Sequence, residues 1–81
     1  MPDSGRRATV FARIGILERQ AKTLEEALTD DAVKAEARAL RVSLERTRVE
    51  LERRTDADAL TAAEHAADAA SLLLASLGRT T

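Results

Sequence analysis

The chain has 81 residues, of which 44% are hydrophobic and 33% are charged, and its net charge is −1. This length leaves room for one small domain, which buries only about 60–65% of the surface that its unfolded chain exposes. The lack of cysteine excludes disulfides, cysteine zinc sites and thiol nucleophiles, and a single histidine excludes a histidine-rich metal site. The abundance of Ala, Leu, Glu and Arg is typical of helical and coiled-coil proteins.

Residues 1–8 contain turn formers and little to bury, so we expect a flexible N-terminal segment before the first helix. Apolar residues then recur at alternating spacings of four and three, a heptad pattern that predicts a helix over about residues 9–28. These residues are Val10, Ile14, Leu17, Ala21, Leu24 and Leu28. Arg13 and Glu18 interrupt the apolar residues near the start, so we expect no signal peptide and a soluble cytoplasmic protein.

A second heptad pattern begins after residues 29–31, Thr-Asp-Asp, which favour turns and helix N-termini. It consists of Val33, Ala37, Leu40, Leu44, Thr47 and Leu51. The step of five residues from Leu28 to Val33 breaks the phase of the pattern, which favours a separate second helix over about residues 31–54. The alternative is one bent, continuous helix, which would make the fold a long helical hairpin.

The third helix is expected over about residues 56–77. Thr55 is the predicted N-cap, with Asp58 completing a short capping box. Gly78 is the predicted left-handed C-terminal cap, and residues 79–81 are expected to form a flexible tail. The apolar residues of this helix again have heptad spacings, and they are Leu60, Ala63, Ala67, Ala70, Leu74 and Leu77.

Three helices of similar length with short connections favour an all-α fold, an antiparallel three-helix bundle with coiled-coil packing in a single domain over residues 9–78. No segment alternates between apolar and polar residues with a period of two, so no strand is expected. Small side chains let helix axes approach closely. We therefore expect the tightest helix contact at Ala63, Ala67 and Ala70.

The second helix carries apolar residues on two sides. At about 100° per residue, Val42 and Val49 point away from the seam of the same helix. Such a helix is either the middle helix of a bundle or a wall shared between subunits. An alanine-rich core without large aromatics leaves little stability for a lone chain, which favours a homo-oligomer, with a homodimer as the first expectation. The predicted self-association residues are Leu40, Val42, Leu44, Val49 and Leu51.

The sequence contains little that predicts chemistry. His65, the only imidazole, lies beside Glu64 and Asp68 on the polar side of the third helix, so we expect a solvated side chain rather than a metal ligand or base. The adjacent acids at 25–26 and 30–31 point about 100° apart and do not converge. The three isolated glycines form no phosphate loop. We therefore expect no catalytic residue, no metal site and no cofactor, and the chain is not predicted to be an enzyme.

Charge is unevenly distributed along the chain. Residues 32–54 sum to +3 and residues 55–81 to −3, which predicts attraction between the second and third helices across their interface. The best candidate for a nucleic-acid surface is a basic stripe on the second helix, formed by Lys34, Arg38, Arg41 and Arg48. Glu45 and Glu52 fall within this stripe and no aromatic residue interleaves it, which favours a solvated, salt-bridged face.

A second candidate surface lies near the start of the chain. Phe11 and Ile16 fall outside the seam of the first helix, and Arg13 lies between them. Exposed apolar residues beside basic ones are typical of a patch that docks a protein partner. A basic amphipathic start is also typical of contact with anionic membrane surfaces, but three glutamates soon dilute the charge.

No motif in the chain identifies a family, so the functional hypothesis rests on architecture. We expect a non-enzymatic helical protein–protein interaction module that self-associates and docks a protein partner in an assembly, adaptor or inhibitory role. The alternative is a small dimeric nucleic-acid-associated regulator that uses the basic stripe of the second helix.

Overall fold

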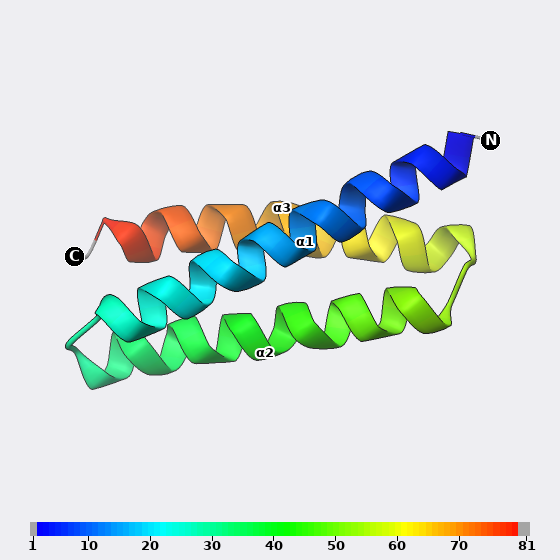
Figure 1. Ribbon diagram of the computed structural model, residues 1–81. Coiled ribbons are helices and arrows are strands. Elements are labelled where there is room, and N and C mark those ends of the chain that lie inside the picture. Colours follow the sequence, from blue (N-terminus) through cyan, green and yellow to red (C-terminus); the bar gives the residue numbers. More distant parts are fainter. Residues whose placement is uncertain (1, 80–81) are drawn as a thin grey trace.

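The computed structural model describes residues 2–79 and places them in three α-helices (Figure 1). Helix α1 spans Pro2–Ala27, α2 spans Asp31–Arg53 and α3 spans Ala57–Gly78. The chain reverses at both short connections, so α2 runs antiparallel to α1 and α3 (Figure 1). No strand occurs in this part of the chain. The all-α prediction is confirmed, and the interruption at residues 28–30 excludes one continuous helix through the first two segments.

The bounds of α2 and α3 lie within one residue of those predicted, whereas α1 begins about seven residues earlier than expected. A proline is compatible with a first helical turn, because the first N–H groups of a helix have no intrahelical partner. Contacts with the other helices hold this early turn: Arg7 Nη1 donates to the carbonyl of Arg54 at 3.0 Å, and Arg6 pairs with Glu64. Positions 1, 80 and 81 of the expected flexible ends lie outside the described residues.

Aspartates form the N-caps of α2 and α3. Asp30 Oδ1 accepts hydrogen bonds from the backbone N–H groups of Ala32 and Val33 at 3.0 and 3.1 Å. Asp56, one residue after the predicted cap Thr55, accepts from the N–H of Ala59 at 3.2 Å. A side-chain bond from Arg54 orients the Asp56 carboxylate and lowers its pKa, which the sequence pattern of the cap does not reveal.

The expected left-handed cap at the end of α3 is absent. Gly78 belongs to the last turn of the helix, and none of the described glycines has a positive φ. The helix instead ends with Arg79, which keeps helical dihedral angles and donates its N–H to the carbonyl of Ser76 at 3.2 Å.

The heptad seams form the core. Its fully buried large side chains are Ile14, Leu44 and Leu51, one from α1 and two from α2. Helix α3 contributes mainly small side chains, and Ala63, Ala67 and Ala70 are each at most 2% exposed. A smaller cluster near the α1–α2 connection is formed by Leu28, Ala37 and Leu77, with Leu24 and Val33 packed against it.

Ala67 is 0% exposed, and its burial predicts that the core has no room for a larger side chain at this position. We expect Ala67→Leu to lower the free energy of unfolding by about 1–3 kcal/mol through overpacking. Ala62→Leu, at an exposed position on the same helix, is the matched control and is expected to change it by less than about 0.5 kcal/mol. Urea unfolding followed by circular dichroism measures both, and equal stability of the two variants would contradict the assignment.

Candidate protein-docking surface

Helix α1 presents glutamates to α2. Glu25 accepts hydrogen bonds from Arg38 Nε at 2.8 Å and Arg41 Nε at 2.9 Å, and Glu18 accepts from Arg48 Nε at 2.9 Å. The Glu25–Arg41 and Glu18–Arg48 pairs share one antiparallel register, because seven residues back along α1 correspond to seven residues forward along α2. Glu25 is buried, with 8% of its surface exposed, so its carboxylate depends on these two arginines.

The opposite flank of α1 presents arginines to α3. Arg6 forms an ion pair with Glu64, and Arg13 Nη1 lies 2.7 Å from Asp68 Oδ1. Glutamates of α1 therefore compensate the positive charge of α2. The segment charges had instead predicted that the acidic α3 would do so. Among the described residues, the ion pair that bridges the α2 and α3 ends is Arg54–Asp56, which spans their short connection.

The basic stripe on α2 is largely engaged within the chain. Arg38 and Arg41 share Glu25, while Arg48 pairs with Glu18 and also with Glu52 at 3.3 Å. The glutamate bonds raise the pKa of Arg41 and of Arg48, so both guanidiniums stay charged. Lys34 is the member of the stripe for which the structure records no ion pair. An arginine whose charge is compensated by a neighbouring carboxylate attracts a phosphate only weakly. This weighs against a nucleic-acid surface on α2.

The structure separates the five residues predicted for self-association. Leu44 and Leu51 are 2% and 1% exposed, because α1 and α3 of the same chain already cover them. Leu40 is partly buried against the same core, and Val42 is half-buried. Val49 is 45% exposed on the outer side of α2. The seam side of α2 is thus covered by the two other helices of the same chain, whereas its second apolar side is half-buried at Val42 and exposed at Val49.

The predicted patch at the start of the chain is not one surface. Phe11 packs against the core, and the Arg7 guanidinium lies 5.1 Å from the centre of its ring. Five residues along a helix correspond to about 140° of rotation, so Ile16 lies on the other flank of α1. Ile16 is 47% exposed, and Arg13 beside it is held by Asp68 and Ser71.

The most exposed large apolar side chains lie elsewhere, on α3. Leu72 is 75% exposed and Leu73 is 52% exposed. No charged residue occurs between Asp68 and Arg79, so ten consecutive residues of the helix are uncharged. The exposed surface of this stretch is here called the α3 ridge, and it is formed by Ala69, Leu72, Leu73, Ala75 and Ser76.

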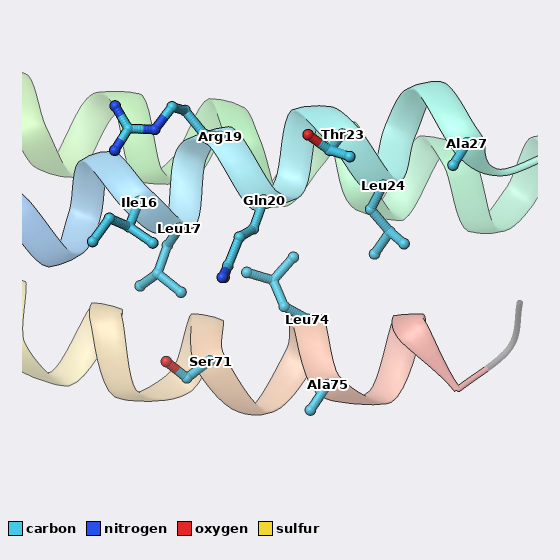
Figure 2. A pocket seen from close by; sticks show the side chains of 10 residues that line it. All are labelled: Ile16, Leu17, Arg19, Gln20, Thr23, Leu24, Ala27, Ser71, Leu74 and Ala75. Carbon is cyan, nitrogen blue, oxygen red and sulfur yellow. The ribbon is translucent and has the colours of Figure 1, made fainter.

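Two open grooves flank the α3 ridge. The α1–α3 groove has a volume of about 630 Å³, and Leu17, Leu24 and Leu74 form its apolar floor (Figure 2). Ile16 lies at the α1 rim of this groove, and the short side chains of Ser71 and Ala75 leave it shallow on the α3 side (Figure 2). The second groove, of about 490 Å³, lies between α2 and α3 and includes Leu40 and Leu73.

Other kinds of site receive no support from the described residues. His65 is exposed, and no cluster of three or more potential metal ligands occurs within residues 2–79. None of the three described helices combines the length and apolar character that crossing a membrane requires.

No family model, curated protein or solved structure matches this chain. The functional interpretation therefore depends on the surface itself. Two features of that surface differ from the rest: charges that are paired between helices on both flanks of α1, and an apolar ridge with two grooves at the C-terminal half of α3.

The Glu25 cluster generates a prediction about acid stability. Hydrogen bonds from Arg38 and then Arg41 hold the pKa of Glu25 below its ordinary value of 4.5, against the opposing effect of burial. A depressed pKa in the folded state stabilises the fold above the unfolded-state pKa, and this contribution is lost as the pH falls through the folded-state value. Glu25→Gln is therefore expected to be less stable than the parent at pH 7 and to lose less stability between pH 5 and pH 3.

Glu26→Gln provides the matched control, because Glu26 is the exposed neighbour and has no ion pair among the described residues. Thermal melts at a series of pH values measure both variants against the parent. A Glu25→Gln curve that runs parallel to the parent curve from pH 7 to pH 3 would show that this carboxylate contributes nothing to the acid transition.

Proposed function

We propose that this chain is a non-enzymatic helical protein–protein interaction module that self-associates and docks a protein partner. The proposed roles are assembly, adaptor or inhibitory docking in the cytoplasm, a compartment with which the lack of cysteine is compatible. The observation that carries the proposal is the α3 ridge, where Leu72 is 75% exposed within ten uncharged residues.

An apolar ridge on a rigid helix is suited to protein docking. Monomeric proteins rarely leave contiguous apolar patches in water, and such patches mark interaction sites. Helical surfaces commonly bind other helices through apolar side chains in grooves, and both grooves beside the α3 ridge have apolar floors. Burying one exposed leucine contributes about 1.5–3 kcal/mol, so Leu72 and Leu73 together supply an appreciable driving force.

The alternative, a nucleic-acid-associated regulator, has weaker support. Arg38, Arg41 and Arg48 of the basic stripe are paired with glutamates of the same chain. A phosphate would have to displace those carboxylates before it could bind. The α3 ridge, in contrast, requires no existing contact to be broken.

Photo-crosslinking in the cells that naturally contain the chain tests the proposal. A photoreactive amino acid at position 72 is expected to give discrete protein adducts, because the ridge is covered by protein in the assembled state. The same group at position 65, exposed on the same helix two turns earlier, is the matched control and should give at least several-fold fewer. Equal, low yields at both positions would contradict docking through the ridge.

A further inference from the structure

We propose that residues 2–9 at the start of α1 form a latch, which opens and closes as one unit while the rest of the bundle stays folded. The closed latch is held by the guanidiniums of Arg6 and Arg7. In the open state residues 2–9 leave the helix, and Glu64 and the carbonyl of Arg54 lose the hydrogen bonds that these arginines donate. The inference goes beyond the proposed docking function and does not depend on it.

The described side chains at the start of α1 contribute nothing to the buried core. Of residues 5–9, Arg7 is half-buried and the others are exposed, and the first buried residue of the helix is Val10, which is 4% exposed. The first turns of α1 also diverge from α2, which leaves them beside α3 (Figure 1). Burial of apolar surface is the main force that holds helices together. Detaching residues 2–9 removes no described side chain from that core.

The sequence of this segment is poorly suited to a helix. It contains Pro2, Asp3, Ser4, Gly5 and Thr9, whose residue types have low helix propensity. A helix gains little by extending over such residues, because most helical stability in proteins comes from packing against other elements. Contacts with the rest of the bundle must therefore hold the segment in its helical state.

Two neighbouring arginines supply those contacts. Arg6 Nε donates to Glu64 Oε2 at 2.8 Å, and a second hydrogen bond from the same guanidinium to Oε1 makes the ion pair bidentate, which fixes its geometry. Arg7 Nη1 donates to the carbonyl of Arg54, at the C-terminal end of α2, at 3.0 Å. Because Arg6 and Arg7 lie on one turn of α1, both contacts break together when that turn detaches.

The latch is exposed and electrostatic. The side chains of Arg6 and Glu64 are 40% and 30% exposed, so dissolved salt screens the attraction between them. Hydrogen bonds from Arg6 lower the pKa of Glu64, which keeps this carboxylate charged near neutral pH. In neutral solution, ionic strength is therefore the condition that shifts the latch towards its open state.

Native-state hydrogen exchange followed by NMR tests the latch. Each N–H group of an α-helix bonds to the carbonyl four residues earlier, so the amides of residues 6–13 lose their acceptors when residues 2–9 detach. We expect these amides to share one level of protection and to exchange at least about a hundredfold faster than the amide of Leu44, a core residue that reports global unfolding. A step to higher protection is expected between Arg13 and Ile14.

Glu64→Gln removes the ionic half of the latch. It is expected to speed exchange of residues 6–13 about twofold to fivefold, which is the effect of losing an exposed ion pair. Raising the salt concentration from about 50 mM to about 500 mM is expected to speed the same amides in the parent and to have less effect in the variant.

Glu52→Gln is the matched control. Glu52 pairs with Arg48 on α2 at 3.3 Å, and both side chains are exposed. This pair stays intact when the latch is open, so the variant is expected to leave residues 6–13 at the parent rate. Either variant can speed exchange at Leu44, because global unfolding breaks both ion pairs.

Three results would overturn the inference. Exchange of residues 6–13 no faster than that of Leu44 would show that the segment unfolds only with the whole chain. Protection that rises gradually from residue 6 to residue 13 would show ordinary fraying of a helix end. Equal effects of the two variants on residues 6–13 would show that Glu64 does not hold the latch. A variant that fails to fold loses protection at Leu44, and the salt series on the parent then tests the latch by itself.

Discussion

The two flanks of α1 carry opposite charges, and the arrangement of the other helices depends on this. Glu18 and Glu25 face α2, whereas Arg6 and Arg13 face α3. Heptad seams alone permit the third helix to pack on either side of the α1–α2 hairpin with similar apolar burial. Exposed ion pairs contribute little stability, typically about 0–1 kcal/mol each. If α3 packed on the other side of the α1–α2 hairpin, however, its acidic residues would face the glutamates of α1. The exposed pairs therefore favour one arrangement without adding much stability, whereas the buried Glu25 also stabilises the fold through its two arginines.

Heptad spacing was sufficient to predict three helices and most of their bounds, because it records which side chains must be buried together. The features that it missed depend on residues distant in the chain. Helix α1 extends back to Pro2, where Arg6 and Arg7 reach Glu64 and the carbonyl of Arg54. Asp56 replaces Thr55 as the cap in the presence of Arg54. The helix that compensates the positive charge of α2 could not be predicted from the net charge of each segment. Net charge does not show toward which neighbouring helix the charged side chains of a helix point.

The candidate site was harder to predict than the fold. An apolar residue on α2 looks the same in the sequence whether a helix of its own chain or a second subunit covers it, and Leu44 and Leu51 proved to be core residues. The α3 ridge did leave a signal, namely the ten residues without charge that precede Arg79. The sequence analysis did not use this signal, because Leu74 and Leu77 lie in the same stretch and belong to the buried heptad seam. Their burial was enough to explain why the stretch is apolar.

The two halves of α3 are held by different interactions, and this connects the fold to docking. In the first half, Glu64 and Asp68 pair with the arginines of α1. In the second half, Arg13 donates a hydrogen bond to Ser71 at 3.2 Å, and beyond this bond the groove beside Ala75 stays open above apolar side chains. A binding partner there adds cover where the chain itself supplies least. Burying a charged side chain under a partner would cost free energy, because the charge would lose its hydration. The absence of charged residues from this half of α3 therefore suits it to docking.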